Sequence, residues 1–177
     1  MTRRHVLATL TVLTLASAFT VQNHGSAAQQ KGVKEQLVGV WSLDSVKNTR
    51  PDGTTFDPWG QAATGTLIYD PSGRFAFMII RGDIPKFERG KATPEQYKAA
   101  SEGVIAYHGT YTVNEGDKTI THKVEGSSFP SLKDTDQKRV VTTINNDELK
   151  YVNPATSFGA KAESSWKRAR THLESGR

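Results

Sequence analysis

The stretch Leu37-Val38-Gly39-Val40-Trp41 opens a run of short apolar segments that decides the expected fold. Its residues alternate, so that Gly39 and Trp41 share one face of a strand predicted over residues 37–46. Near the other end of the chain, Trp166 and Arg168 stand on a last short strand, residues 164–168. We expect these two strands to meet, so that the chain between them closes into a barrel around a cavity.

Segments of strand composition recur at regular spacing between these two ends. Turn residues separate them, for example Asp70-Pro71-Ser72-Gly73, Glu115-Gly116-Asp117 and Asn145-Asn146-Asp147, where Pro, Gly and Asn favour tight turns. Short connections between consecutive strands predict antiparallel neighbours. The sequence therefore predicts an all-β fold, an eight-stranded antiparallel up-and-down barrel that can hold one small ligand. The predicted strands are residues 37–46, 64–69, 74–81, 107–114, 118–125, 137–144, 148–152 and 164–168.

One helix is predicted, inserted between the third and fourth strands. Thr93 supplies the N-cap, Pro94 the first helical position and Gln96 the third position of a capping box. We expect this helix to reach about Ala106, and to cover one barrel opening or pack on the outside. Both faces of the third strand are apolar, so one set should fill the barrel and the other meet the helix. These sets are Phe75, Phe77 and Ile79, and Ala76, Met78 and Ile80.

The first 28 residues are expected to be an export signal and not part of the fold. Arg3 and Arg4 precede an apolar segment, residues 6–21, and Ser26-Ala27-Ala28 fits the small-x-small cleavage rule. The two arginines also fit a twin-arginine signal, and an ordinary secretory signal is the alternative. We therefore expect one domain over residues 35–170, located in the periplasm or secreted, with no stable membrane anchor after cleavage.

Composition excludes several classes of partner and site. The formal net charge is +5. Without the two arginines of the export signal, the chain has 21 basic and 18 acidic residues. No run of five or six like charges is present, so we expect no nucleic-acid partner. The chain has no cysteine, which excludes disulfides, thiolate metal sites and cysteine nucleophiles. It has no HxH or HExxH pair, so we expect no metal and no cofactor.

The spacing Gly39-x-Trp41 on the first strand, with Trp166-x-Arg168 on the last, resembles the lipocalin pattern. In that family the Trp lies at the closed end of the barrel, and an Arg of the final strand packs across its indole. The resemblance implies a calycin-type barrel and assigns Gly39, Trp41, Trp166 and Arg168 to barrel closure. It implies little about activity. The segments 37–43, 65–74, 93–97, 107–111 and 122–127 resemble bacterial and fungal lipocalin-like domain proteins, over about residues 36–168.

Two residues, His122 and Arg139, are candidates for a role in binding or catalysis. His122 shares its strand face with Ile120 and Val124, so it is expected to point inward. It can act as a general base, a proton donor or a haem ligand, or bond to an interior Tyr or Glu. Arg139, if it points inward, needs a carboxylate of a ligand or of the protein, because a buried unpaired guanidinium costs several kcal/mol. The alternative is an exterior Arg beside Lys138.

The sequence thus predicts an exported protein that binds one small hydrophobic or amphipathic molecule inside the barrel. We expect the ligand at the end opposite Trp41, near His122, Tyr111 and the loop of Phe129. Two alternatives stay open: an isomerase or cyclase that uses His122 and a Tyr as an acid–base pair, and a structural envelope protein with a filled barrel. A cavity of roughly a few hundred Å³ around His122 would favour binding or catalysis. The predicted ligand-binding residues are His122, Tyr111, Tyr107, Arg139, Tyr69, Phe77, Tyr151 and Phe129.

Overall fold

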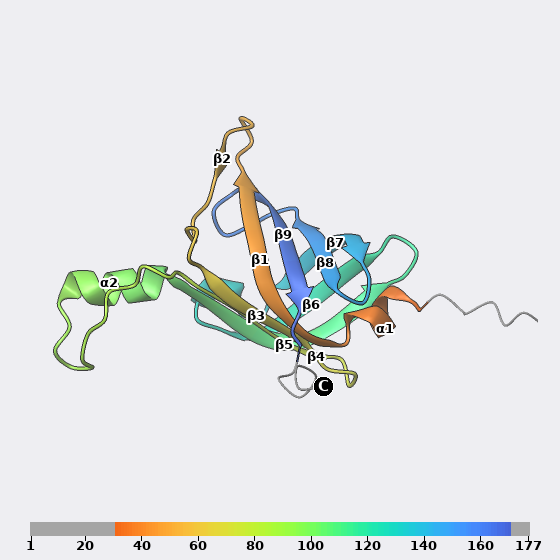
Figure 1. Cartoon of the computed structure of the whole chain (residues 1–177), viewed down its shortest axis with the longest axis horizontal. Coiled ribbons are helices and arrows are strands. Elements are labelled where there is room, and N and C mark those ends of the chain that lie inside the picture. The colour runs from red at the N-terminus through yellow and green to blue at the C-terminus, as the bar shows by residue number, and fades with distance from the viewer. Residues whose placement is uncertain (1–30, 171–177) are drawn as a thin grey trace, which may run out of the picture. The chain divides into compact units, whose positions relative to one another are not determined.

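The computed structural model describes residues 31–170, whose strands form one antiparallel sheet (Figure 1). The predicted export signal, residues 1–28, lies outside the described residues. None of the helices in the described part of the chain is long and apolar enough to cross a membrane. In chain order the elements are α1 (Val33–Leu37), β1 (Gly39–Thr49), β2 (Thr55–Phe56), β3 (Thr64–Tyr69), β4 (Arg74–Ile80), α2 (Pro94–Glu102), β5 (Val104–Asn114), β6 (Thr119–Ser127), the 3-10 turn η1 (Pro130–Leu132), β7 (Asp136–Ile144), β8 (Glu148–Asn153) and β9 (Lys161–Arg168).

Eight of these strands close into a barrel. The sheet runs β2-β1-β3-β4-β5-β6-β7-β8-β9, every pair is antiparallel, and β1 also pairs with β9. In the closing pair, Trp41 lies opposite Arg168 and Leu43 opposite Trp166. The short strand β2 was not among the predicted strands, and it pairs with the last two residues of β1. The predicted eight-stranded up-and-down barrel with one helix between its third and fourth strands is confirmed.

The alternating strand directions give the barrel two distinct ends. The start of β1, the end of β9 and the tight turns β3–β4, β5–β6 and β7–β8 lie together at one end, which we call the closed end. The longer connections β1–β3, β4–β5, β6–β7 and β8–β9 lie at the other, the open end. A residue's distance along its strand from a tight turn therefore shows which half of the barrel it occupies.

The helix α1 was not expected, and it includes Leu37, the first residue of the strand predicted over residues 37–46. It buries Val33 and Leu37, and the Leu37 carbonyl accepts a 2.8 Å hydrogen bond from Trp41 Nε1. No side chain caps the helix locally. Instead, the Glu115 carboxylate accepts from the backbone N–H groups of Val33 and Lys34, at 2.7 and 2.9 Å. A carboxylate favours a helix N-terminus, but this one comes from the β5–β6 turn, so no local motif could reveal it.

Arg168 holds the closed end together. Its guanidinium lies 4.0 Å from the centre of the Trp41 ring and donates to the carbonyls of Val38 and Gln36, at 2.9 and 2.7 Å. Gly39 has a φ of +136°, and a Cβ there would lie 2.6 Å from Arg168 Nη1. A side chain at this position would therefore both strain the backbone and displace the guanidinium.

The helix α2 begins where it was predicted to begin, but it ends earlier and it does not pack on the barrel. Thr93 Oγ1 accepts from the Gln96 N–H, and Gln96 Oε1 accepts from the Thr93 N–H, which completes the capping box. The helix ends at Glu102, short of Ala106, because Gly103 follows and residues from Val104 onward pair with β4. It buries none of its residues and lies away from the barrel, so it does not cover an opening (Figure 1).

The two apolar faces of β4 also have different surroundings from those expected. Phe75, Phe77 and Ile79 are buried in the barrel, as one of the two expected sets. The other set does not meet α2: Ala76 and Met78 lie on the outer face of the sheet, and Met78 is 38% exposed. The reason is that the β4–β5 connection carries the helix beyond the ends of both strands.

Trp41→Ala is expected to lower the free energy of unfolding by about 3–5 kcal/mol, because it removes a fully buried ring and the surface on which Arg168 packs. Chemical denaturation measures this loss. The control is Val40→Ala on the same strand, where a 41% exposed side chain should cost less than about 1 kcal/mol. Equal losses in the two variants would contradict the role assigned to Trp41.

Candidate functional site

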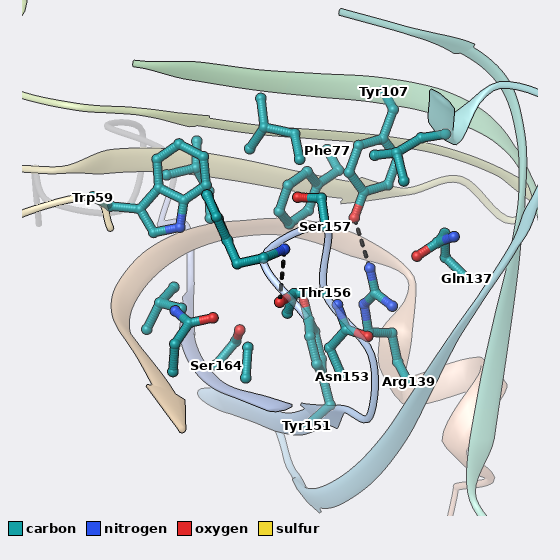
Figure 2. Close-up of a pocket in the computed structure, with 17 residues that line it drawn as sticks. Trp59, Phe77, Tyr107, Gln137, Arg139, Tyr151, Asn153, Thr156, Ser157 and Ser164 are labelled. Carbon is teal, nitrogen blue, oxygen red and sulfur yellow. Dashed lines mark hydrogen bonds between the residues drawn. The ribbon is translucent and has the colours of Figure 1, made fainter. Parts of the chain in front are cut away.

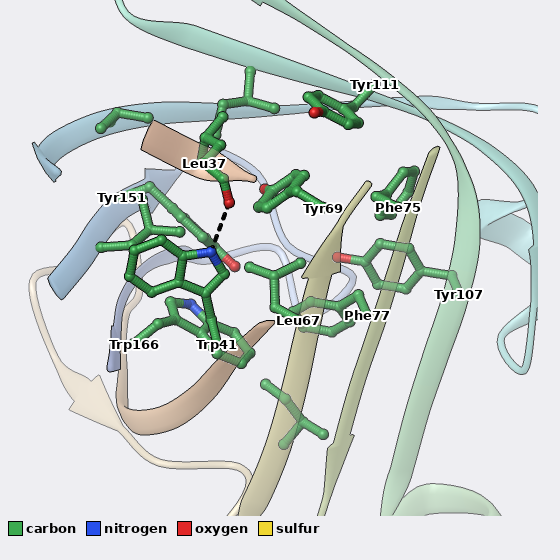
Figure 3. Packing of buried hydrophobic residues seen from close by; sticks show 14 of the residues in the cluster. Leu37, Trp41, Leu67, Tyr69, Phe75, Phe77, Tyr107, Tyr111, Tyr151 and Trp166 are labelled. Atoms are coloured by element: carbon green, nitrogen blue, oxygen red, sulfur yellow. Dashed lines mark hydrogen bonds between the residues drawn. The ribbon is translucent and has the colours of Figure 1, made fainter. Parts of the chain in front are cut away.

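The half of the barrel nearest the closed end is filled by aromatic side chains (Figure 3). His122 is fully buried, stacks on Phe75 with ring centres 4.1 Å apart, and has its Nε2 2.8 Å from the Tyr69 hydroxyl oxygen. Tyr69 in turn meets Tyr111 edge to face, at 4.9 Å, and the Tyr111 hydroxyl donates to the Asp70 carbonyl. These rings leave His122 in contact with the core and not with a cavity.

Burial sets the protonation of this pair. Burial, and after it the positive charge of Arg139, holds the pKa of His122 well below 6.5, so the ring is neutral. Burial also raises the pKa of Tyr69 well above 10.0, so its hydroxyl keeps its proton. Both groups are therefore neutral, and the tautomer of the ring decides whether the Tyr69 hydroxyl donates to Nε2 or accepts from it. The other ring nitrogen, Nδ1, has no hydrogen-bond partner in the described residues.

The expectation that His122 and Tyr111 lie at the open end is wrong. Both stand three residues from the tight β5–β6 turn, His122 after the start of β6 and Tyr111 before the end of β5. Tyr69 is the last residue of β3, directly before another tight turn. All three consequently lie in the closed half with Trp41. The sequence pattern correctly placed His122 on the inner face, but a face does not specify a height along the barrel.

A cavity of about 60 Å³ lies in the open half (Figure 2). Its walls come from β1, β4, β5, β7, β8 and β9, together with the loops that precede β3, β7 and β9. It is lined by Val46, Asn48, Trp59, Phe77, Ile79, Ile105, Tyr107, Leu132, Gln137, Arg139, Tyr151, Asn153, Thr156, Ser157, Phe158, Ala162 and Ser164.

The structure divides the eight predicted ligand-binding residues into two groups. Phe77, Tyr107, Arg139 and Tyr151 line the cavity together. His122, Tyr69 and Tyr111 lie in the closed half, outside the lining. Phe129 also lies outside it, as a 46% exposed side chain, and Leu132 of the same connection contacts the cavity instead.

The floor of the cavity contains buried polar groups whose bonding capacity is not used. Arg139 is 4% exposed, so the inward orientation is the correct one of the two alternatives. Its guanidinium donates to the Tyr107 hydroxyl, at 2.9 Å, and lies 5.8 Å from the centre of the Tyr151 ring. Asn48 is 1% exposed, and its Nδ2 has no hydrogen-bond partner among the described residues; neither has the Tyr151 hydroxyl. Such groups are uncommon in folded proteins and require an explanation.

The mouth of the cavity is aromatic. Trp59, from the β2–β3 connection, and Phe158, from the β8–β9 connection, meet edge to face at 6.1 Å. Phe56 of β2 contacts the other side of Phe158, also at 6.1 Å. Trp59 is buried, whereas Phe158 is 50% exposed. Two separate loops therefore contribute an apolar rim above the polar floor.

Sequence reasoning missed most of the lining. One usable pattern was present, since polar residues recur at inward positions near the open ends of several strands, namely Asn48, Gln137, Asn153 and Ser164. Trp59 and residues 156–158 lie in loops. Loops have no regular alternation, so the sequence pattern does not indicate where their side chains point. Among residues 31–170, no group of three or more His, Asp or Glu side chains is arranged to hold a metal ion.

The low pKa of His122 predicts a specific pH dependence of stability. A His with a folded pKa below its unfolded value of about 6.5 binds fewer protons when folded, so stability falls as pH decreases through that value. Between about pH 7.5 and about pH 5.5, the wild type should lose up to about 1.4 kcal/mol per pH unit more than His122→Gln. The Gln retains an acceptor for the Tyr69 hydroxyl. Urea denaturation at each pH measures the difference, and parallel curves would contradict a buried neutral His122.

Comparisons with known proteins found one matching family profile and several similar solved structures. The lipocalin-like domain profile matches residues 38–174. None of the curated protein sequences matches the chain. Similar solved structures include a lipocalin-like protein from Bacteroides uniformis, with 13% identity, a TM-score of 0.43 and coverage of 76% of this chain and 99% of that one.

Two other solved structures are similar to a comparable degree. Bovine odorant binding protein in complex with a selenium-containing odorant has 14% identity, a TM-score of 0.42 and coverage of 82% of this chain and 78% of that one. A redesigned β-barrel bound to DFHBI has 18% identity, a TM-score of 0.40 and coverage of 78% and 100%. Since the profile match spans all strands from β1 to β9, the chain belongs to the lipocalin-like domain family.

Proposed function

We propose that this chain is an exported binding protein that holds one small amphipathic molecule at the open end of its barrel. The observation that supports this proposal is the cavity itself, which combines an aromatic mouth with buried polar groups that lack partners. Family membership supports it too, since an eight-stranded barrel can enclose one small ligand. Export to the periplasm or beyond is proposed from the basic, apolar and small-residue pattern of residues 1–28.

The size of the cavity limits how the ligand is held. About 60 Å³ is well below the roughly 300–1,000 Å³ of sites that enclose a drug-sized molecule. It accommodates a polar head group of a few atoms. The apolar part of the ligand then lies toward the mouth, against Trp59 and the half-exposed Phe158. Burial of that part stabilises the complex by about 25 cal/mol per Å² of apolar surface.

The two alternative functions have less support in the geometry. An acid–base enzyme that uses His122 needs this ring within hydrogen-bond reach of a substrate, and His122 is fully buried away from the cavity. A purely structural barrel matches the filled closed half. It does not account for the space in the open half, nor for the unpartnered Asn48 amide beside that space.

Ala162→Leu is expected to abolish ligand retention, because Ala162 is buried on β9 and lines the cavity, which the larger side chain would fill. Native mass spectrometry and solvent extraction of protein purified from its own host should detect a small molecule on the wild type and little or none on the variant. Thermal melting confirms that the variant is folded.

The matched control is Glu163→Gln, the next residue of β9, whose side chain points outward and pairs with Lys161 on the surface. It should retain the small molecule at the level of the wild type. The proposal fails if the wild type carries nothing and binds no amphipathic probe, or if Ala162→Leu retains as much as the control.

A further inference from the structure

Arg139 introduces a positive charge into the barrel, and no carboxylate of the described residues pairs with it. Its side chain is buried, and none of the ion pairs formed within residues 31–170 includes it. Among the described residues that line the cavity, Arg139 is the only charged one. A guanidinium stays protonated in proteins, so burial cannot neutralise it, and an isolated buried charge is costly. Within residues 31–170, this charge is thus left uncompensated.

The hydrogen bonds of Arg139, a residue of the cavity lining, use only part of its donor capacity. Nη2 donates to the Tyr107 hydroxyl, at 2.9 Å, and Nη1 to the carbonyl of Lys138, the preceding residue, at 2.6 Å. Of the five N–H donors of a guanidinium, the other three have no partner in the described part of the chain. Figure 2 shows the Tyr107 hydroxyl above the guanidinium, with Tyr151 and Asn153 beside it. The tyrosine thereby orients the planar group without compensating its charge.

A second unsatisfied donor faces the same space. Asn48, on β1 across the barrel from β7, is 1% exposed, lines the cavity and has no partner for its Nδ2. Unpartnered donors therefore belong to two separate strands of the cavity wall, β1 and β7. A group with several acceptor oxygens and one negative charge is complementary to the Arg139 charge and to these donors.

We propose that Arg139 binds the carboxylate of a small amphipathic monocarboxylic acid, whose apolar part extends toward Trp59 and Phe158. This inference rests on the proposed function and specifies its ligand class. A carboxylate fits better than a phosphate, since one guanidinium and no lysine line the cavity, and a phosphate has a charge of about −1.5 to −2. It also fits the volume of about 60 Å³ beneath the aromatic mouth. Planar carboxylates match the guanidinium fork in two parallel hydrogen bonds.

The test compares two probes of equal chain length, octanoate and 1-octanol, by isothermal titration calorimetry on the full-length mature protein. The wild type should bind octanoate at least about tenfold more tightly than octanol, which corresponds to about 1.4 kcal/mol. Arg139→Gln should remove this preference by weakening octanoate binding about tenfold or more, with octanol affinity within about threefold of the wild type. Arg139→Met, which keeps the apolar stem of the side chain, is the second variant in case the glutamine amide perturbs folding.

The matched control is Lys138→Gln, which removes one positive charge from the exposed neighbouring position of β7. It should keep the preference for octanoate, because its side chain lies outside the barrel. Two outcomes overturn the inference and leave the binding function intact: equal affinity of the wild type for both probes, and a preference for octanoate that survives in Arg139→Gln and Arg139→Met. Binding of neither probe by the wild type would instead overturn the proposed function, and this inference with it.

Discussion

The contact between Arg168 and Trp41 fixes where the last strand returns to the first. The guanidinium covers the indole and, through the carbonyls of Gln36 and Val38, also joins β9 to the end of α1. A cation–π contact contributes about 0.5–2 kcal/mol, and the charged hydrogen bonds add to it. Gly39 leaves the space for the guanidinium. Closure at this point pairs β1 with β9 and so leaves the eight barrel strands without an open edge.

Closure at one end has a consequence for the interior. The helix α1 and the tight turns seal the closed half, where Tyr69, His122 and Phe75 pack without intervening space. An unpartnered atom there, His122 Nδ1, has no cavity beside it. In the open half the long connections leave room, and the unpartnered groups of Asn48 and Arg139 border that room. Both halves of the barrel contain buried polar groups. The open half is the candidate binding site because it also contains a cavity beside those groups, whereas the closed half is packed core.

Local chemistry explains which features were predictable. The capping box of Thr93 and Gln96 and the turn at residues 70–73 depend on residues a few positions apart, and both are found as expected. Alternation also depends on near neighbours, but irregularities in the β1–β9, β5–β6 and β7–β8 pairs interrupt it. The helix α1 was not predictable, because its N-terminal N–H groups are satisfied by Glu115, about eighty positions away. The end of α2 was misplaced for a similar reason, since β5 begins where pairing with β4 begins.

For the candidate site, alternation grouped residues by strand face and led to a candidate set that includes Phe77, Tyr107 and Tyr151, but it left both orientations of Arg139 open. The sequence alone therefore established the barrel, its closing residues and much of its inner face, because these follow from periodicity and short spacings. Only the tertiary structure decided that His122 is core, that Arg139 is buried without a carboxylate, and that Trp59 and Phe158 form the mouth. Those properties depend on strand register, on height along the barrel and on contacts between distant loops, none of which a local pattern encodes.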